Sequence, residues 1–213
     1  MIDIGFLIDR SGSMKKFYDK EKSFIKKVAE KFGLSESGMH GGVVTFSEGT
    51  LKEKRIPLNK YTDIGLFGKE VDKLPAPERG RTRIDQGLMM SLELFTTAAG
   101  SRPNTKKALF LVTDGAQNPK VDDDGNAINP AKTAERFHQN GIPIYALAVG
   151  KKINVTELEQ ITGSSKMVYL LNNFDALIND DFIKSISKEV CNRPANISKL
   201  TGRTGQKISN LYQ

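Results

Sequence analysis

Residues 4–13 read Ile-Gly-Phe-Leu-Ile-Asp-Arg-Ser-Gly-Ser, an apolar run followed at once by the oxygen-bearing side chains of Asp9, Ser11 and Ser13. The apolar half is typical of a strand that is buried on both faces of a parallel sheet. The polar half would then form the loop at the carboxyl end of that strand, where open α/β sheets hold their ligands. Oxygen ligands of this kind suit hard divalent cations such as Mg²⁺. The stretch therefore predicts an α/β fold with a metal site on its first loop.

Apolar runs recur along the chain and alternate with amphipathic stretches. Five of them predict strands, at residues 2–8, 42–46, 108–113, 142–149 and 167–171. A more polar run at residues 51–58 contains Pro57 and four charged residues, so it predicts an antiparallel edge strand in a hairpin with residues 42–46. The expected sheet therefore has six strands, mostly parallel, with one antiparallel strand at an edge.

Helices are predicted between these strands, at residues 17–32, 61–74, 84–99, 130–140, 155–162 and 174–190. The first of them places Phe17, Phe24, Ile25, Val28 and Phe32 on one apolar stripe. Strands that alternate with helices imply a doubly wound α/β fold, in which helices cover both faces of the sheet. We expect one domain of this kind at residues 1–191, followed by a basic polar linker or tail at residues 192–213.

The chain of 213 residues carries a net charge of +7. Several lysines gather near the first helix, namely Lys15, Lys16, Lys20, Lys22, Lys26 and Lys27. They predict either a solvated helix face or a patch for polyanions such as acidic glycans. No aromatic residues interleave with them, so nucleic acid is not an expected partner. No stretch approaches the roughly 18 apolar residues of a membrane span. Because a core strand follows Met1 directly, we expect a module cut from a longer protein.

Two more loops add oxygen donors to the predicted metal site. Thr82 stands just before the helix predicted from residue 84, and Asp114 ends the apolar run that finishes at Thr113. Together with the first loop they offer two carboxylates and three hydroxyls. If one carboxylate acts through water, the cation keeps an open position that an acidic group of a partner can complete. The alternative is that these residues only form turns and cap helices.

This order of loops resembles the von Willebrand factor A domain family, which includes the inserted domains of integrins. Asp9, Ser11 and Ser13 match the family's Asp-x-Ser-x-Ser motif, Thr82 matches its threonine, and Asp114 matches its second aspartate. The resemblance extends from about residue 2 to residue 192. It implies the same doubly wound sheet, with one antiparallel strand at an edge.

The resemblance also implies a metal-ion-dependent adhesion site, with Mg²⁺ expected and Mn²⁺ or Ca²⁺ as alternatives. The two serines would coordinate directly, whereas Asp9 and Asp114 often act through water in this family. Thr82 would coordinate directly only in a ligand-bound form, and a Glu or Asp of a protein partner would supply the last oxygen. The last helix, at residues 174–190, would be the element that shifts if the domain switches.

Some residues depart from the family pattern. Ile84 stands where the family often has a second hydroxyl, and Arg10, Arg81 and Arg83 add positive charge around the site. That charge would either favour acidic ligands or lower the metal affinity. The segment at residues 116–129 includes the run Asp-Asp-Asp-Gly-Asn, which predicts a turn, with a second calcium site as the alternative.

These features predict a non-enzymatic adhesion module, secreted or on a cell surface, that binds a protein presenting Glu or Asp, such as collagen or another matrix component. The single cysteine, Cys191, and the sequons at Asn154 and Asn196 agree with a secreted glycoprotein. The alternatives are an intracellular A domain that scaffolds a complex and metal-independent binding of acidic glycans. A hydrolase is not expected, because no His, Lys or Cys accompanies the metal loops, and His40 and His138 are isolated.

Overall fold

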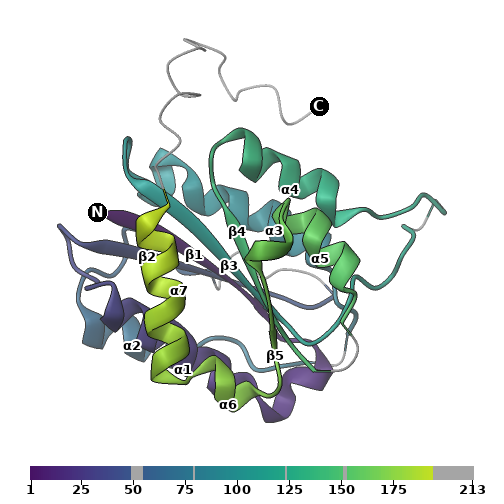
Figure 1. Ribbon diagram of the computed structural model, residues 1–213, viewed down its shortest axis with the longest axis horizontal. Helices are drawn as coiled ribbons and strands as arrows, with labels where there is room; N and C mark the ends of the chain where they lie inside the picture. Colours follow the sequence, from purple (N-terminus) through teal and green to yellow (C-terminus); the bar gives the residue numbers. More distant parts are fainter. Residues whose placement is uncertain (49–54, 79, 123, 151–152, 194–213) are drawn as a thin grey trace.

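The computed structural model describes residues 1–48, 55–78, 80–122, 124–150 and 153–193. Within them a parallel sheet runs in the order β2-β1-β3-β4-β5 (Figure 1). Its strands are β1 Ile2–Asp9, β2 Met39–Phe46, β3 Lys106–Thr113, β4 Ile144–Val149 and β5 Val168–Leu171. Non-consecutive strands are neighbours at the centre of the sheet, as in doubly wound folds. The α/β prediction is therefore confirmed.

Side chains on successive strand residues point to opposite faces of the sheet, so apolar side chains lie on both faces. Helices cover both of these faces. Phe6 and Ile8 of β1 pack in one apolar cluster, while Leu7 packs in the other. The first cluster contains residues of α1 Tyr18–Lys31, α2 Ile64–Asp72, α6 Phe174–Leu177 and α7 Asp180–Asn192. The second contains residues of α3 Ile84–Leu92, α4 Pro130–Gln139 and α5 Val155–Thr162.

Three predicted helices are shorter or divided in the structure. The helix predicted at residues 61–74 covers only Ile64–Asp72. The helix predicted at residues 84–99 ends at Leu92 and continues as the 3₁₀ turns Glu93–Phe95 and Thr97–Ala99. The helix predicted at residues 174–190 is two helices, because the side chain of Asn179 caps α7 by accepting hydrogen bonds from the amides of Asp181 and Phe182. A capping residue inside a helical pattern therefore marked a helix start.

The edges of the sheet differ from the prediction in two ways. β5 is only partly buried, with Leu170 57% exposed, because it is the last strand on its side. Most of the strand predicted at residues 51–58 lies outside the described residues. In the described part, Ile56 and Val43 form an antiparallel bridge with two hydrogen bonds of 2.8 and 2.9 Å. The described sheet has five parallel strands, and the sixth, antiparallel strand stays a prediction.

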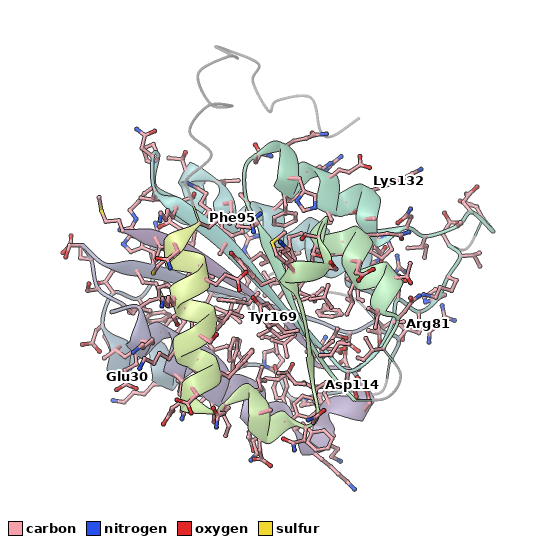
Figure 2. The ribbon with its side chains drawn as sticks, viewed as in Figure 1. Glu30, Arg81, Phe95, Asp114, Lys132 and Tyr169 are labelled. Carbon is pink, nitrogen blue, oxygen red and sulfur yellow. The ribbon has the colours of Figure 1, made fainter. Side chains whose placement is uncertain are left out.

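Because the strands are parallel, the loops after β1, β3 and β4 lie at one end of the sheet, together with the start of α1. Asp114 and Arg81 are labelled on the same side of the molecule in Figure 2. At the other end, the ammonium group of Lys106, the first residue of β3, donates to the carbonyl of Cys191 in α7. The predicted tail at residues 192–213 lies almost wholly outside the described residues.

Candidate metal centre

Asp9 is the last residue of β1 and is completely buried. Its Oδ1 accepts a hydrogen bond of 2.8 Å from the amide of Ser11, and its Oδ2 accepts one of 2.9 Å from Thr113 Oγ1. Burial raises the pKa of Asp9 to about 6, although the hydrogen bonds from Ser11 and Thr113 favour the charged form. The carboxylate is therefore held in one orientation between the ends of β1 and β3.

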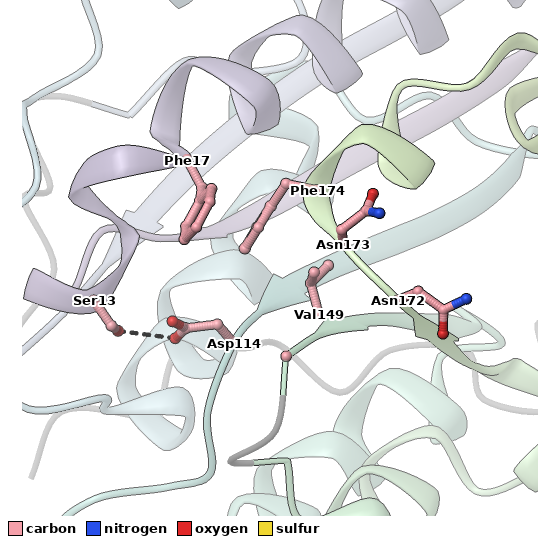
Figure 3. Close-up of a pocket in the computed structure, with 8 residues that line it drawn as sticks. Ser13, Phe17, Asp114, Val149, Asn172, Asn173 and Phe174 are labelled. Carbon is pink, nitrogen blue, oxygen red and sulfur yellow. Dashed lines mark hydrogen bonds between the residues drawn. The ribbon is translucent and has the colours of Figure 1, made fainter.

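A row of oxygen atoms connects the loop after β1 to the loop after β3. Ser11 Oγ lies 3.1 Å from Ser13 Oγ, and Ser13 Oγ donates to Asp114 Oδ1 over 2.9 Å (Figure 3). Ser11 is buried, Ser13 is exposed and Asp114 is half-buried. The row of oxygen atoms therefore extends from the interior to the surface. Four of the five predicted site residues, Asp9, Ser11, Ser13 and Asp114, lie together.

Thr82 lies on a third loop, and hydrogen bonds join this loop to the loops after β2 and β3. The amide of Arg83 donates to the carbonyl of Ser47 over 2.9 Å, and the amide of Asn118 donates to the carbonyl of Thr82 over 3.0 Å. Thr82 Oγ1 is 4.0 Å from the point where a Cβ on Gly115 would lie. The structure therefore places the fifth predicted residue beside the loop that carries Asp114.

Each of the three arginines near the site has a carboxylate partner. Arg10 is 2% exposed and pairs with Glu78 at 2.6 Å, and this hydrogen bond lowers the pKa of Glu78. Arg83 binds Asp85 through Nε and Nη2, both at 2.8 Å. Arg81 lies 3.8 Å from Glu48. The positive charge expected around the site is therefore balanced locally.

Gln117 positions the loop after β3, and no motif or periodicity indicated this role. Its side chain is almost wholly buried and exchanges hydrogen bonds with Asp85 at the start of α3, accepting from the amide over 3.1 Å and donating to the carboxylate over 2.7 Å. Its own amide donates to Glu157 of α5 over 2.8 Å. The loop that carries Asp114 is thus tied to two helices.

Glu21 is a third carboxyl group close to the site, and it lies inside the protein. It belongs to α1 and is completely buried, and within the described structure its carboxyl oxygens make no well-formed hydrogen bond, although the backbone N–H of Asp9 favours the charged form. Burial, together with the charges of Asp9 and Asp114, raises the pKa of Glu21 well above its usual value. Its position three residues from Tyr18 and from Phe24, on the buried face of the helix, was the available sequence signal.

A groove of about 360 Å³ opens beside the row of oxygen atoms (Figure 3). Ser13 and Asp114 belong to its lining, together with Phe17 and Phe174. The sequence placed Phe17 on the apolar stripe of the first helix, but it is 38% exposed and stacks on Phe174 instead. Phe17 precedes the helix, so the periodicity of α1 does not decide where its side chain lies.

The remaining candidates have structural partners elsewhere. His40 Nε2 lies 3.1 Å from the carbonyl of Glu36, and His138 Nε2 lies 3.0 Å from that of Ile161, as expected for packing residues. Asp122 Oδ1 accepts hydrogen bonds from the amides of Asp124 and Asn126, which confirms a turn there. In the part of the chain that the structure describes, no three or more His, Cys, Asp or Glu residues gather into a metal site.

The lysines near the first helix are largely paired. Ion pairs join Lys20 to Asp175, Lys26 to Asp72 and Lys27 to Asp180. The ammonium group of Lys22 donates to the carbonyl of Asp72 over 3.1 Å. These contacts favour a solvated helix face over a patch for polyanions.

Known proteins resemble this chain over most of its length. The human collagen alpha-6(VI) chain is 32% identical over 197 residues, which are 90% of this chain and 8% of the human chain. Cuticlin-6 of Caenorhabditis elegans is 25% identical over 83% of this chain and 28% of its own length. This chain therefore corresponds to a small part of these relatives.

Solved structures show the same architecture. Proximal thread matrix protein 1 from the mussel byssus superposes with a TM-score of 0.79 and 29% identity, over 90% of this chain and 48% of the mussel protein. Another structure of the mussel protein, with a TM-score of 0.77 and 28% identity over the same shares of the two chains, is described as having a zinc-occupied MIDAS motif, a metal-ion-dependent adhesion site.

None of the helices in the described ranges has both the length and the apolar character that crossing a bilayer requires. The family profile described as von Willebrand factor type A domain matches residues 3–184. The match covers well over half of the chain and agrees with the doubly wound sheet. The chain belongs to the von Willebrand factor type A domain family.

Proposed function

We propose that this domain binds a divalent cation, Mg²⁺ in the first place, and uses it to hold an acidic side chain of a protein partner. The observation that carries the proposal is the row of oxygen atoms from Ser11 through Ser13 to Asp114, with contacts of 3.1 and 2.9 Å. Hard cations prefer oxygen ligands, and all five proposed ligands carry oxygen donors. The proposed ligands are Asp9, Ser11, Ser13, Thr82 and Asp114.

These residues would have different tasks. Both oxygens of Asp9 already accept hydrogen bonds, from Ser11 and Thr113, which supports a role through water rather than by direct contact. Ser13 is exposed, so a partner can reach the cation from that side. When bound, the cation supplies positive charge and an open coordination position for a partner's carboxylate.

We further propose that the domain is a non-enzymatic module of an extracellular matrix or adhesion protein. The support is the likeness to collagen VI chains and to a byssal matrix protein, although this chain spans 8% and 48% of their lengths. In the described structure both histidines bond to backbone carbonyls away from the site, so neither is placed to serve as a base there. Collagen, or another matrix protein that presents Glu or Asp, is the proposed partner.

The test is binding of the purified domain to a panel of matrix proteins and sulfated glycans, in Mg²⁺ and then in EDTA. We expect binding to a matrix protein that is lost in EDTA and in the Ser11→Ala variant. Ser185→Ala, which removes an exposed hydroxyl from α7, is the matched control and should bind normally. Binding that persists in EDTA and weakens with salt would instead assign the function to the basic surface.

A further inference from the structure

We propose that the groove beside the metal centre binds an uncharged aromatic or aliphatic side chain that neighbours the metal-bound Glu or Asp in the partner's chain. This inference rests on the proposed function, because Ser13 and Asp114 are both proposed metal ligands and lining residues of the groove. A partner carboxylate on the cation would therefore bring the next residues of its chain to the mouth of the groove.

The groove has an aromatic wall that is open to solvent. The rings of Phe17 and Phe174 stack with their centroids 4.3 Å apart and their planes 10° from parallel (Figure 3). Phe174 is almost buried, whereas Phe17 is 38% exposed. Val149, the buried last residue of β4, belongs to the lining behind these rings. An apolar side chain that entered would stack on or pack against these groups and leave water.

Gly150 lines the groove next to the loop that carries Asp114. Its φ is +116°, a conformation that residues with a side chain rarely adopt. A Cβ at this position would lie 3.8 Å from the carbonyl oxygen of Asp114. That distance is an ordinary contact, so the backbone conformation and not a lack of space favours glycine here.

The rim of the groove can bind a peptide backbone. Asn172 and Asn173 are both exposed lining residues. Asn173 Oδ1 already accepts a hydrogen bond of 3.0 Å from the amide of Ala176, as the cap of α6. Asn172 is the second exposed amide on this rim, and an amide side chain can both donate and accept hydrogen bonds.

Size and charge favour one side chain as the occupant. The volume of about 360 Å³ lies at the lower end of the roughly 300–1,000 Å³ typical of ligand pockets. Among the lining residues that the structure describes, only Asp114 is charged, and the cation would engage it. A charged side chain would lose its hydration among the phenylalanines without gaining a charged partner from the described lining residues, which is unfavourable. The expected ligand is thus a segment with an acidic residue next to Phe, Tyr, Leu or a similar residue.

The experiment compares four capped tripeptides, Gly-Phe-Glu, Gly-Gly-Glu, Gly-Phe-Gln and Gly-Gly-Gln, by NMR titration of the isotope-labelled domain in Mg²⁺ and in EDTA. We expect Gly-Phe-Glu to bind at least about tenfold more tightly than Gly-Gly-Glu in Mg²⁺, a 1.4 kcal/mol difference. In Phe17→Ala this advantage should disappear, while Gly-Gly-Glu and Mg²⁺ bind as before. Leu66→Ala, which shortens an exposed apolar side chain on α2, should retain the advantage.

The outcomes separate the two proposals. Equal Mg²⁺-dependent binding of Gly-Phe-Glu and Gly-Gly-Glu would overturn the groove and leave the proposed function standing. Equal binding of Gly-Phe-Glu in Mg²⁺ and EDTA would overturn the coupling between groove and cation. If no Glu peptide binds in Mg²⁺, the proposed function fails, and the groove inference fails with it. An unchanged advantage in Phe17→Ala would also contradict the inference.

Discussion

Ser13 Oγ donates a hydrogen bond of 2.9 Å to Asp114 Oδ1, although the two residues are 101 positions apart in the chain. The bond joins the loop after β1 to the loop after β3, two strands that are neighbours in the sheet. It brings a hydroxyl and a carboxylate to the distance at which both can serve one cation. The geometry of the candidate metal centre therefore follows from strand order.

Replacement of Asp114 tests the metal centre directly. Asp114→Ala removes one of only two carboxylates in the proposed ligand set, so we expect Mg²⁺ affinity to fall by at least about tenfold, a loss of 1.4 kcal/mol or more. Because Asp114 is half-buried and at the surface end of the row, the fold should persist. Calorimetric titration with Mg²⁺, with circular dichroism as the check on folding, measures both. Asp72→Ala, which removes a carboxylate that pairs with Lys26, should bind Mg²⁺ normally, and normal binding by Asp114→Ala would refute the assignment.

The pKa of Asp9, raised to about 6 by burial, predicts a pH dependence of stability in the absence of metal. In the unfolded chain Asp titrates near 3.9, so between about pH 4 and pH 6 the folded protein binds more protons than the unfolded chain. The free energy of unfolding should therefore fall as the pH rises through this window, by an amount on the order of 2 kcal/mol. Urea unfolding in EDTA at several pH values measures it, and Asp9→Asn should reduce the dependence, while the part that comes from the raised pKa of Glu21 remains. A wild-type curve that is level across the window would contradict the prediction.

Metal binding should show the opposite trend with pH. A cation is held by the deprotonated carboxylate, so protons compete with it. Below pH 6 we expect Mg²⁺ affinity to fall by about tenfold per pH unit, because one proton must leave Asp9 for each cation bound. Titrations at pH 5, 6 and 7 would measure the slope. Affinity that stays constant from pH 7 to pH 5 would exclude Asp9 from the metal centre.

We expect the buried carboxyl group of Glu21 to lower the free energy of unfolding. Within the described structure its carboxyl group is buried without a well-formed hydrogen bond, and a group of this kind costs about 1–3 kcal/mol. Glu21→Met keeps a side chain of similar length and removes the polar group, so we expect the free energy of unfolding at pH 7 to rise by roughly that amount. Glu30→Met, an exposed change on the same helix, is the control and should have little effect. A destabilised Glu21→Met variant would mean that the carboxyl group makes a favourable interaction after all.

The cap of α7 gives a separate test of the division between α6 and α7. Asn179 accepts hydrogen bonds from two amides of the first turn, at 3.0 and 3.1 Å. Asn179→Ala should lower the free energy of unfolding by about 1 kcal/mol, the usual effect of losing such a cap. Asn192→Ala, at the opposite end of the helix, should change it far less. Equal effects of the two substitutions in urea unfolding would contradict the assigned cap.

The strands and most helices were predictable because their signals are local. The apolar run of β1 and the Pro at the start of α4 depend only on neighbouring residues, and both elements form as predicted. Helix ends were less predictable. The helical pattern at residues 174–190 continues across Asn179, and only the capping geometry shows that the chain turns there. A cap is indicated by one residue, and one residue is hard to recognise as a cap within a longer apolar periodicity.

The sequence by itself determined the α/β class, the alternation of elements and the residue types of the candidate metal centre. Each of these depends on residues that are close together in the chain: the periodicity of a strand or helix, or a strand followed directly by oxygen donors. Only the tertiary structure decided that Glu21 lies buried near Asp9, that each nearby arginine has a carboxylate partner, and that Phe17 stacks on Phe174 beside Ser13. These relationships join segments that are distant in the chain. They depend on how helices pack over the sheet, and the spacing of residues along one segment carries no information about that packing.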